Sequence, residues 1–531
     1  MILSPRSRRP LVLAIIIGFF FIFLVHRSQP ETGFRTMFKP QQAPVGSTSS
    51  PTVSIVSKPP VAAFDDEPSP QLVDYWTAVL DAVMNADPEI EGIKLTQPSP
   101  AAEDMDPNVQ RAKEIDIAQR IEHVDMPASD RAMLKSTHAQ MVKSAKQLGP
   151  MIPYTKNSKG IVMTAGGKYV GNAILSLTML RRTGSKLPVQ LFIDGADNST
   201  RALCEGILLD LGVECRSMDA MFGTTPHMPE LEKFQYKVFS LLFSSFDDVL
   251  FLDADCYPLY SPDHLFDVDP YKSYGLVTWP DLWISTVSPT YYEIAGVKKP
   301  PTVRTRRTSE SGVFMIKRST HAEDLLLATY YNFFGPEVYY RLFSQGGHGE
   351  GDKETFLHAA IALDKPFWDV HTVLGFLGRW LNGTFEGVGM KQADPVKDFN
   401  LWKAQDSDHA VDGPDSPRAP HMFIHFNNLK VDIQNSLNEV MDKVLRVNGT
   451  GHHTPLWGDE SVLNKLTGYD IEKVMWEEVI RLACTQPVQE GCDRLIPWYQ
   501  KVFLKSKKLS RGWKGKGTQS SADADKVIEK T

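Results

Sequence analysis

From Lys159 onward, short and solidly apolar runs alternate with stretches in which apolar residues recur at helical spacing. The first pattern is typical of strands buried on both faces, and the second of the helices that cover them. The predicted strands are Gly160–Met163, Val189–Ile193, Val213–Met218, Val249–Leu252, Tyr274–Thr278 and Gly312–Lys317. The predicted helices are Val170–Thr183, Arg201–Leu211 and Glu230–Ser245. This alternation predicts an α/β fold with a mixed, mostly parallel sheet and helices on both faces.

The beginning of the chain has a different pattern. An unbroken apolar run of 15 residues, Leu11–Val25, follows three arginines and is closed by His26 and Arg27. It predicts a transmembrane signal anchor over residues 11–27, short for a bilayer but suited to a thin early-secretory membrane. The alternative is a cleaved signal peptide, but no small-x-small cleavage site follows the run. With residues 1–10 in the cytosol, the rest of a single-pass type II protein would be lumenal.

Composition divides the remaining chain into further segments. Residues 28–70 are rich in Pro, Ser, Thr and Gln, which predicts a disordered stem. Residues 71–150 carry apolar positions at helical spacing and predict a helical region. The α/β pattern predicts one domain over residues 151–450. A helical extension over 451–504 and a basic, then polar tail over 505–531 complete the predicted organisation.

The overall composition narrows the class of protein. With 531 residues, 42% of them hydrophobic and 23% charged, the chain has the composition of a globular protein with a sizeable core. Its net charge of −7 and pI of about 6.1 argue against a nucleic-acid partner. Five cysteines are too few for a small disulfide-stapled scaffold.

Two observations bear on a lumenal location. Two pairs of cysteines, Cys204/Cys215 and Cys484/Cys492, are close enough in sequence to form short-loop disulfides, and Cys256 is left over. The sequence cannot establish this pairing. Three N-x-S/T sequons, a number expected by chance in a chain this long, predict N-glycosylation at Asn198, Asn382 and Asn448. The lumenal prediction therefore rests mainly on the anchor.

Asp253 and Asp255 form the most informative motif. D-x-D pairs occur elsewhere in the chain, but only this one directly ends a solidly apolar strand that follows a helix. Residues i and i+2 of an extended segment point to the same side, so both carboxylates can face one ligand. The carboxyl end of a strand is where open α/β sheets bind ligands. The pair therefore predicts a divalent-cation site, and the alternative is a capped strand-to-loop turn.

A divalent cation at this place has a chemical use. Breaking a sugar–diphosphate bond leaves negative charge on the departing nucleotide, and a cation neutralises that charge as it develops. The acidic pair therefore indicates a transferase that uses a nucleotide sugar. A short cytosolic tail, one anchor, a stem and a lumenal body are the layout of a Golgi glycosyltransferase.

At this point the sequence resembles the fungal Golgi α-mannosyltransferase family, with spacing closer to the α-1,2 branch-initiating type than to the α-1,3 type. The ordered set of matching motifs spans about half of the chain, from Lys159 to Asp432. The motifs are Gly160–Tyr169, Lys237 with Ser244–Asp255, Trp279–Asp281, Glu310–Gly312 and Gly349–Phe356. Cys256 is a departure, because the family often has Asn after the acidic pair; this leaves the geometry of the metal loop open.

The resemblance implies a GT-A fold, GDP-mannose as the donor, Mn²⁺ as the cofactor and retention of anomeric configuration. It also implies that a late histidine completes the metal site, for which His425 is the candidate beside Asp253 and Asp255. The alternative for His425 is a buried, hydrogen-bonded core histidine. Expected partners are a mannose-containing glycan acceptor, the membrane through one N-terminal helix, and other Golgi transferases.

The donor-binding candidates lie at the ends of the first strands. A turn of small residues lets a nucleotide approach the backbone, and the lysine that follows can meet phosphate charge. These candidates are Thr164, Ala165, Gly166, Gly167 and Lys168, then Asp194 for ribose or base and Lys237 for the diphosphate. The alternatives are ordinary turns at Gly166–Gly167 and Asp194–Gly195, and a solvated helix lysine at Lys237.

Two carboxylates after a Gly-rich loop are the catalytic candidates. Asp352 and Glu354 stand at the start of the apolar helix Phe356–Leu363. Either can face the reacting sugar, stabilise positive charge at its anomeric carbon or accept a hydrogen bond from the acceptor hydroxyl. Asp352 is preferred over Glu354. The alternative for Asp352 is a helix N-cap without any part in the reaction.

A third group of residues suits a sugar. Aromatic faces pack against pyranose rings while carboxylates bind the hydroxyls, and the alternative for the tryptophans is core packing. The candidates are Trp279, Asp281, Trp283 and Glu310. Together these motifs predict a retaining, Mn²⁺-dependent α-mannosyltransferase of the Golgi membrane that extends glycoprotein or cell-wall mannan glycans. The alternatives are a retaining transferase that uses another nucleotide sugar, and a catalytically silent scaffold of a Golgi transferase complex.

Overall fold

The computed structural model of the chain describes residues 64–65, 67–101, 120–225, 228–229, 231, 233–301, 306–404, 416–434, 437–484 and 490–504. The predicted cytosolic tail, the anchor over 11–27, the stem up to residue 63 and the tail over 505–531 lie outside these residues. Among the helices that are described, none combines the length and the apolar composition needed to cross a membrane.

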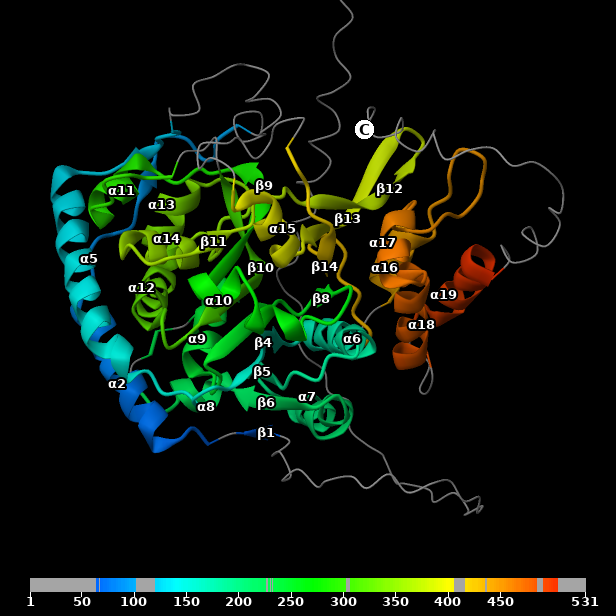
Figure 1. Cartoon of the computed structure of the whole chain (residues 1–531), viewed down its shortest axis with the longest axis horizontal. Coiled ribbons are helices and arrows are strands. Elements are labelled where there is room, and N and C mark those ends of the chain that lie inside the picture. The colour runs from blue at the N-terminus through cyan, green and yellow to red at the C-terminus, as the bar shows by residue number, and fades with distance from the viewer. Residues whose placement is uncertain are drawn as a thin grey trace, which may run out of the picture. The chain divides into compact units, whose positions relative to one another are not determined.

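The largest element is an eight-stranded sheet in the order β1-β6-β5-β4-β7-β10-β9-β11 (Figure 1). Its strands are β1 (Phe64–Asp65), β4 (Lys159–Gly166), β5 (Val189–Asp194), β6 (Val213–Ser217), β7 (Asp248–Leu252), β9 (Leu276–Ile284), β10 (Arg307–Lys317) and β11 (Trp368–Asp369). Strands β1, β6, β5, β4 and β7 are parallel to one another, whereas β10 is antiparallel to both β7 and β9. The expectation of a mixed, mostly parallel α/β sheet is confirmed.

The direction of the strands determines which residues meet. Because β4, β5 and β7 are parallel, the residues that follow them emerge at the same edge of the sheet. Strand β10 runs the opposite way, with Val313 opposite Leu252, so its first half lies beside the carboxyl end of β7. One edge of the sheet therefore collects the ends of three strands and the beginning of a fourth.

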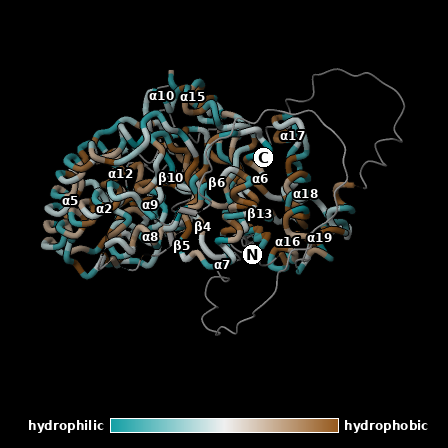
Figure 2. Tube along the Cα trace, turned by 90° about the horizontal axis from the view of Figure 1, so that it is seen from below, coloured by the Kyte–Doolittle hydropathy of each residue, from teal (hydrophilic) through white to brown (hydrophobic). Residues whose placement is uncertain are grey.

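Helices cover this sheet from two sides. Helices α6 and α9 both pack against β4, and Figure 1 shows them on opposite sides of that strand. The helices of the α/β part are α6 (Tyr169–Arg182), α7 (Asn198–Leu203), α8 (Met218–Phe222), α9 (Tyr236–Phe243), α10 (Tyr271–Tyr274), α11 (Pro289–Ala295), α12 (Ala322–Phe333), α13 (Tyr340–Ser344), α14 (Thr355–Ala362) and α15 (Pro395–Trp402). Figure 2 shows hydrophobic stretches along the central strands, where the buried core lies.

Some predicted boundaries differ from the structure. The predicted helix Arg201–Leu211 is interrupted, because Gly206 has non-helical dihedral angles and residues Cys204–Leu208 form a π turn after α7. The predicted helix Glu230–Ser245 begins only at Tyr236 as α9. Tyr274 belongs to helix α10, and Gly275 in the left-handed conformation (φ 72°) separates it from β9.

A second, four-stranded sheet has the order β12-β13-β14-β8. Its strands are β8 (Cys256–Pro258), β12 (Gly375–Leu381), β13 (Thr384–Ala393) and β14 (His421–His425). The C-terminal helices are α16 (Asn438–Val444), α17 (Ser461–Thr467), α18 (Ile471–Ala483) and α19 (Cys492–Tyr499). The buried carboxylate of Glu472 on α18 accepts hydrogen bonds from the backbone N–H groups of Leu456 (2.6 Å) and Trp457 (2.9 Å), which fixes the preceding loop to this helix.

The N-terminal part of the described chain is integrated with the α/β core. It contains α2 (Pro70–Asn85), α5 (Ala128–Leu148) and a small sheet of β2 (Lys94–Leu95) and β3 (Val124–Asp125). The end of the predicted stem is ordered: Phe64–Asp65 forms β1, which pairs with β6, and Ser69 caps α2 by accepting a hydrogen bond from the Leu72 N–H. The folded body therefore begins before residue 71, the predicted boundary.

Trp76 on α2 attaches this helix to the core. Its side chain is fully buried. Its ring centroid lies 5.5 Å from that of Phe239 and 5.4 Å from that of Phe243 on α9, and both ring pairs are T-shaped. Its Nε1–H donates to the Thr225 hydroxyl at 3.3 Å. We expect Trp76→Ala to lower the free energy of unfolding of the full chain by about 3–5 kcal/mol, because the cavity cannot collapse between two packed helices.

Met84→Ala is the matched control for this prediction, because Met84 lies on the same helix and is 46% exposed. It is expected to change the free energy of unfolding by less than about 0.5 kcal/mol. Denaturant titration of the two variants checks the difference. Equal midpoints would contradict the attachment of α2 through Trp76.

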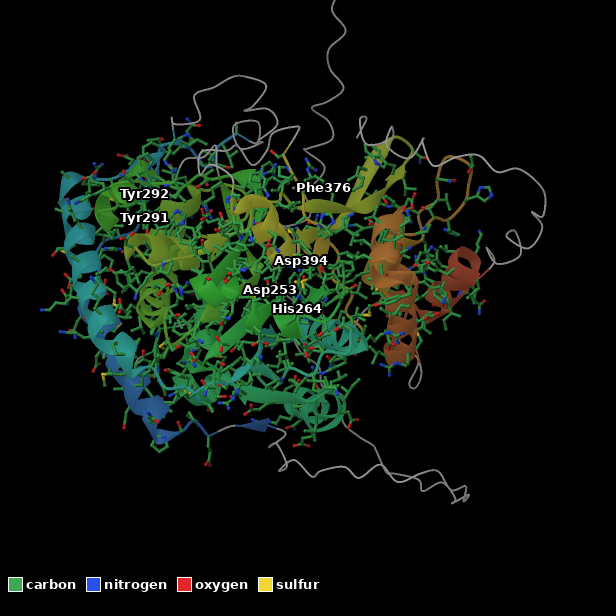
Figure 3. All side chains as sticks on the ribbon, in the orientation of Figure 1. Asp253, His264, Tyr291, Tyr292, Phe376 and Asp394 are labelled. Atoms are coloured by element: carbon green, nitrogen blue, oxygen red, sulfur yellow. A yellow bond between two sulfur atoms is a disulfide. The ribbon has the colours of Figure 1, made fainter. Side chains whose placement is uncertain are left out.

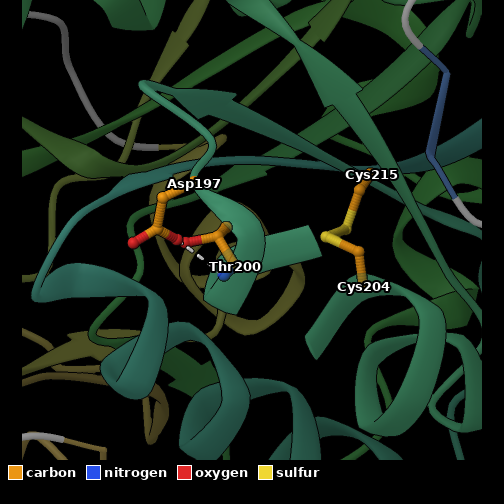
Figure 4. Close-up of a disulfide and its surroundings, with 4 residues drawn as sticks. All are labelled: Asp197, Thr200, Cys204 and Cys215. Carbon is orange, nitrogen blue, oxygen red and sulfur yellow. Dashed lines mark hydrogen bonds between the residues drawn. A yellow bond between two sulfur atoms is a disulfide. The ribbon is translucent and has the colours of Figure 1, made fainter. Parts of the chain in front are cut away.

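Both cysteine pairs are disulfides. Cys204 and Cys215 join the turn after α7 to β6, with Cα atoms 6.0 Å apart (Figure 4). Near this bond, Asp197 caps α7 by accepting a hydrogen bond from the Thr200 N–H at 2.8 Å. Cys484 and Cys492 join the end of α18 to the start of α19, and Cys256 is free and buried. The two short-loop pairings that the sequence left open are therefore the ones present.

Candidate functional site

The loop after β7 is held by neighbouring strands on both sides. The Asp253 N–H donates to the Gly312 carbonyl of β10 at 2.9 Å, and the Phe426 N–H donates to the Asp255 carbonyl at 3.0 Å. Between them, the Cys256 N–H closes a turn on the Asp253 carbonyl at 2.9 Å. Figure 3 labels Asp253 at this position. The backbone thus fixes where both carboxylates of the acidic pair stand.

His425 joins the acidic pair, as predicted. It ends β14, where it lies opposite Cys256 of β8. Its Nε2 lies 3.2 Å from Asp255 Oδ1 and 3.8 Å from Asp253 Oδ2. One ligand atom from each of the three side chains lies within 4.8 Å of the others. A core histidine without a ligand role is the weaker interpretation, because this imidazole faces two carboxylates.

Glu310 orients this histidine. Its Oε1 lies 3.3 Å from His425 Nδ1, and the same oxygen accepts a hydrogen bond from the Gly312 N–H. Burial alone would raise the pKa of Glu310, but the neighbouring His425 lowers it. The sugar-binding prediction for Glu310 is corrected by this geometry, because its buried carboxylate supports the imidazole.

Lys237 lies inside the acidic cluster, closer to the carboxylates than the sequence suggested. Its Nζ is 3.1 Å from Asp253 Oδ1 and 3.3 Å from Asp352 Oδ2, and it donates to the Ser311 carbonyl at 2.8 Å. Burial would lower the pKa of Lys237, but the carboxylates of Asp253, Asp352 and Glu310 raise it above its usual value. The alternative of a solvated helix lysine is wrong, because the side chain is buried.

Two polar residues of this cluster were not singled out from the sequence. The Ser311 hydroxyl lies 3.2 Å from Asp352 Oδ1 and 3.0 Å from Lys237 Nζ, and Lys430 Nζ contacts Asp255 Oδ2. Ser311 lies within the Glu310–Gly312 motif, and Lys430 follows His425 by five residues. These positions are the signals that could have identified both.

Asp352 is connected to the acidic pair through Lys237. It is 3% exposed, and its carboxylate contacts Lys237 and Ser311. Burial raises the pKa of Asp352, Lys237 lowers it and Asp253 raises it further. Asp352 is followed by α14, whose N-terminal cap is Glu354. The N-cap alternative for Asp352 is therefore wrong, and its side chain belongs to the cluster.

Glu354 occupies a different environment. Its carboxylate lies 3.3 Å from Arg306 Nη2 and 3.0 Å from His358 Nδ1, and it accepts a hydrogen bond from the Ser309 N–H at 2.9 Å. Burial would raise the pKa of Glu354, but Arg306 and His358 lower it. Its contacts with Arg306 and Ser309 join the start of α14 to the start of β10, and its contact with His358 lies within α14. Of the two catalytic candidates, only Asp352 therefore reaches the acidic cluster.

We expect Glu354→Gln to lower the free energy of unfolding, because the contacts of Glu354 are structural. The substitution removes one of the two carboxylates that pair with the buried Arg306, whose other partner is Asp369 at 2.9 Å. It is expected to cost about 1–3 kcal/mol, because buried donors lose a charged acceptor. Glu350→Gln is the control, since Glu350 pairs with Arg341 at 3.3 Å on a partly exposed surface, where loss of a pair costs less than about 1 kcal/mol. Denaturant titration of full-length variants measures both. A stable Glu354→Gln protein without turnover would return Glu354 to the catalytic candidates.

The two tryptophans of β9 separate into a core residue and a surface residue. Trp279 is fully buried and donates from Nε1 to the Ala393 carbonyl at 2.8 Å, so its sugar-platform prediction is corrected to core packing. Trp283 is partly exposed, and its ring lies 4.7 Å from that of His348. Asp281 accepts a hydrogen bond from Lys353 Nζ at 2.8 Å. Trp283 and Asp281 thus lie against the Gly-rich loop that precedes Asp352.

The donor-loop candidates lie at the carboxyl end of β4. Gly166 is opposite Asp194 of β5, and a Cβ on Gly166 would be 3.1 Å from the Asp194 carbonyl oxygen. Gly167 has a φ of 49° and open space beside it, and Lys168 is exposed. Burial and the neighbouring Asp219 raise the pKa of Asp194. The turn is therefore open on one side, and donor binding by Thr164, Ala165, Gly166, Gly167 and Lys168 stays a prediction.

The three sequons lie at accessible positions. Asn198 at the start of α7 and Asn382 between β12 and β13 are exposed, and Asn448 is partly exposed. The Asn448 side-chain oxygen accepts hydrogen bonds from Thr450 and His452. All three asparagines are therefore compatible with the predicted glycosylation.

The side chains at the end of β7 fit a divalent cation. Two carboxylates and one imidazole are a donor set that suits Mn²⁺ or Mg²⁺. Glu310 on Nδ1 leaves Nε2 of His425 directed at the carboxylates, which is the outer-shell arrangement typical of metal-binding histidines. The fit therefore rests on Asp253, Asp255 and His425, with Glu310 as support.

Comparison with known proteins connects this site to a family. The family model described as "Mannosyltransferase putative" matches residues 158–308 and 302–394. The chain is 34% identical to Alpha-1,2-mannosyltransferase MNN21 of Candida albicans over 416 residues, 67% of this chain and 62% of that protein. It is 33% identical to Alpha-1,2-mannosyltransferase MNN2 of Saccharomyces cerevisiae over 314 residues, 52% of this chain and 52% of that protein. Over residues 158–394 the chain is therefore similar to this mannosyltransferase family.

The match has defined limits. The chain spans about three fifths of the first of these relatives and about half of the second. The family region contains Asp253, Asp255 and Asp352 and ends before His425. Among solved structures, the galactosyltransferase LgtC with donor and acceptor sugar analogues aligns with 40% of this chain and 73% of its own, at 14% identity and a TM-score of 0.28. Mouse xyloside xylosyltransferase 1 aligns with 40% of this chain and 84% of its own, at 12% identity and a TM-score of 0.26.

Proposed function

We propose that this protein is a retaining, metal-dependent α-mannosyltransferase of GT-A type that transfers mannose from GDP-mannose to mannose residues of glycoprotein or cell-wall mannan glycans, with α-1,2 favoured over α-1,3 linkage. The observation that carries the proposal is the cluster of Asp253, Asp255 and His425 at the carboxyl end of β7. The relatedness of residues 158–394 to mannosyltransferases supports mannose as the transferred sugar.

The metal site follows from the donor set. Asp253, Asp255 and His425 would hold Mn²⁺, and Glu310 would keep the imidazole oriented through Nδ1. A bound divalent cation supplies positive charge that stabilises a departing diphosphate. Lys237 and Lys430 add ammonium groups beside the same carboxylates. The site thus concentrates positive charge where the nucleotide leaves.

Asp352 supplies negative charge on the other side of Lys237. Because Lys237 lies between Asp253 and Asp352, the metal ligands and this carboxylate belong to one continuous cluster. A carboxylate in this position can stabilise positive charge at the anomeric carbon or accept a hydrogen bond from the acceptor hydroxyl. Ser311 holds the carboxylate in place. Trp283 and Asp281, beside the loop that precedes Asp352, are proposed to contact a sugar.

The location is proposed from the sequence outside the described residues. A signal anchor over 11–27 would place the enzyme in the Golgi membrane as a single-pass type II protein with a lumenal body. Two disulfides are the kind of cross-link that persists in oxidising compartments, which supports a lumenal body. Other Golgi transferases are expected partners.

A donor panel tests the proposal. The full chain in detergent is incubated with Mn²⁺, methyl α-mannoside and each of several GDP- and UDP-sugars, and nucleotide release is measured. The expected result is GDP release from GDP-mannose alone, stimulated by the mannoside and abolished by EDTA. Turnover with a UDP-sugar instead would overturn the mannose assignment. Silence of folded protein with every donor would favour the scaffold alternative.

A further inference from the structure

The hairpin of β12 and β13 carries large aromatic side chains on an exposed face. Trp380 is 69% exposed and Phe376 is 56% exposed, whereas large apolar side chains are usually buried. Phe385 lies between them on the partner strand, with ring centroids 5.5 Å from Trp380 and 6.3 Å from Phe376. Figure 3 labels Phe376 on β12. The three rings form one patch, called here the aromatic face.

The opposite side of the same hairpin is firmly packed. Leu377, Arg379 and Leu381 alternate with the exposed rings and are buried. Arg379 donates hydrogen bonds to the Lys443 carbonyl at 2.7 Å and to the Thr454 carbonyl at 3.0 Å, and pairs with Glu386. The hairpin is therefore anchored to the C-terminal region, and the aromatic face is presented on a fixed support.

This face continues toward the metal site through small residues. A Cβ on Gly378 would clash with the Glu386 carbonyl oxygen at 2.2 Å and with Phe385 Cζ at 2.8 Å, so only glycine fits where β12 and β13 approach each other. A Cβ on Gly387 would be 3.9 Å from Asn428 Nδ2, and Asn428 is exposed. Asn428 stands between His425 and Lys430, both of which contact the acidic pair. Strand β13 also pairs with β14, with Met390 opposite His425.

We propose that the aromatic face binds the non-reacting part of an α-mannan acceptor chain, whose reacting end lies at the metal site. This inference rests on the proposed function and names an acceptor subsite for it. Pyranose rings present apolar C–H faces that pack against aromatic rings.

The charges near the hairpin favour a neutral glycan over a membrane. Lys391 is paired with Glu460 at 2.9 Å, and Arg446 is paired with Glu386. Surfaces that bind anionic bilayers combine aromatic groups with unpaired basic side chains. Asn428 instead offers an amide that can hydrogen-bond to sugar hydroxyls. A polyhydroxylated, uncharged chain matches this combination of aromatic rings and amide.

The test compares acceptors of two lengths with the full chain and a double variant, Phe376→Ala with Trp380→Ala. With α-linked mannohexaose, the KM is expected to rise about ten-fold or more, because two stacking partners are lost. With methyl α-mannoside, which is too short to reach the aromatic face, kcat and KM are expected to stay unchanged. Trp380→Tyr is expected to retain most of the affinity for mannohexaose. Met151→Ala, at a 61% exposed position before β4, is the control and is expected to leave kcat and KM unchanged with both acceptors.

Each other outcome contradicts the subsite. Equal loss with both acceptors would place the rings in the reaction centre or in folding, and no change with either would remove them from acceptor binding. Normal acceptor kinetics combined with loss of binding to anionic vesicles, or with a shift from dimer to monomer, would assign the face to a membrane or to a second copy.

Calorimetric titration with mannohexaose and no donor separates this inference from the proposed function. Binding by the wild type and not by the variant supports the subsite even if no mannose is transferred.

Discussion

Replacing Asp255 by asparagine is expected to lower kcat/KM for mannose transfer by about 10²–10³-fold, the effect typical of losing one preorganised electrostatic contact to a transition state. Asp255 is 6% exposed and lies 3.2 Å from His425 Nε2. Asparagine keeps the size of the side chain but removes the negative charge that a cation requires. The initial rate of GDP release at several Mn²⁺ concentrations measures the change, and the dependence on Mn²⁺ is expected to weaken with the rate.

The chain offers a matched control for this variant. Asp267 belongs to another D-x-D pair, and its exposed carboxylate contacts Lys159 at 2.9 Å. Asp267→Asn is expected to leave turnover unchanged and to cost less than about 1 kcal/mol of stability, as exposed ion pairs do. An Asp255→Asn protein with the Mn²⁺ dependence of the wild type would contradict the metal assignment.

Asp352→Asn is expected to reduce kcat by about 10²–10⁴-fold while GDP binding remains, the range seen when a positioned acid–base group is lost. Asparagine can still interact with Ser311, so the loop should keep its position. What disappears is the negative charge beside the reacting sugar. Single-turnover rates with GDP-mannose and a mannoside acceptor measure the chemistry, and calorimetry with GDP and Mn²⁺ measures binding.

The pair of measurements separates a direct role from a structural one. If Asp352→Asn lowers kcat and GDP affinity together, Asp352 acts mainly by holding Lys237 and the diphosphate site. Near-normal turnover would remove Asp352 from the mechanism. Glu310 would then be the one carboxylate of the described cluster, apart from the metal ligands, that is left for this role. It already contacts His425.

The parts predicted best from the sequence are those fixed by local pattern. The buried strand Val249–Leu252 and the acidic pair after it could be predicted because an apolar run, a preceding helix and i, i+2 spacing act within a few residues. His425 lies far away in the sequence and was identified through the family resemblance and its place at the end of an apolar run. The structure brings it within reach of both carboxylates.

The parts that could not be predicted depend on pairing between distant strands. Strand β10 is antiparallel to β7, which turns Glu310 toward His425 and brings Ser311 to Lys237. Nothing in the local sequence distinguishes a carboxylate that faces a ligand from one that faces a neighbouring strand, as Glu354 does. For the same reason Trp279 was predicted as a sugar platform and lies in the core.

The start of the folded body was also misplaced, and for a related reason. Phe64–Asp65 sits in a Pro- and Ser-rich stretch, so its composition predicts disorder. Pairing with β6 nevertheless makes it an edge strand of the main sheet. A two-residue strand carries too little local pattern to be recognised before its partner is known.

The measurement that tests the central claim most directly is Mn²⁺ binding by electron paramagnetic resonance, with and without GDP, on the full chain. The account predicts one bound Mn²⁺ per chain whose affinity increases with GDP. This binding should be lost in Asp255→Asn, weakened in His425→Ala and kept in Asp267→Asn. A wild-type chain that binds no Mn²⁺ in the presence of GDP, or an Asp255→Asn variant that binds it equally well, would contradict the account.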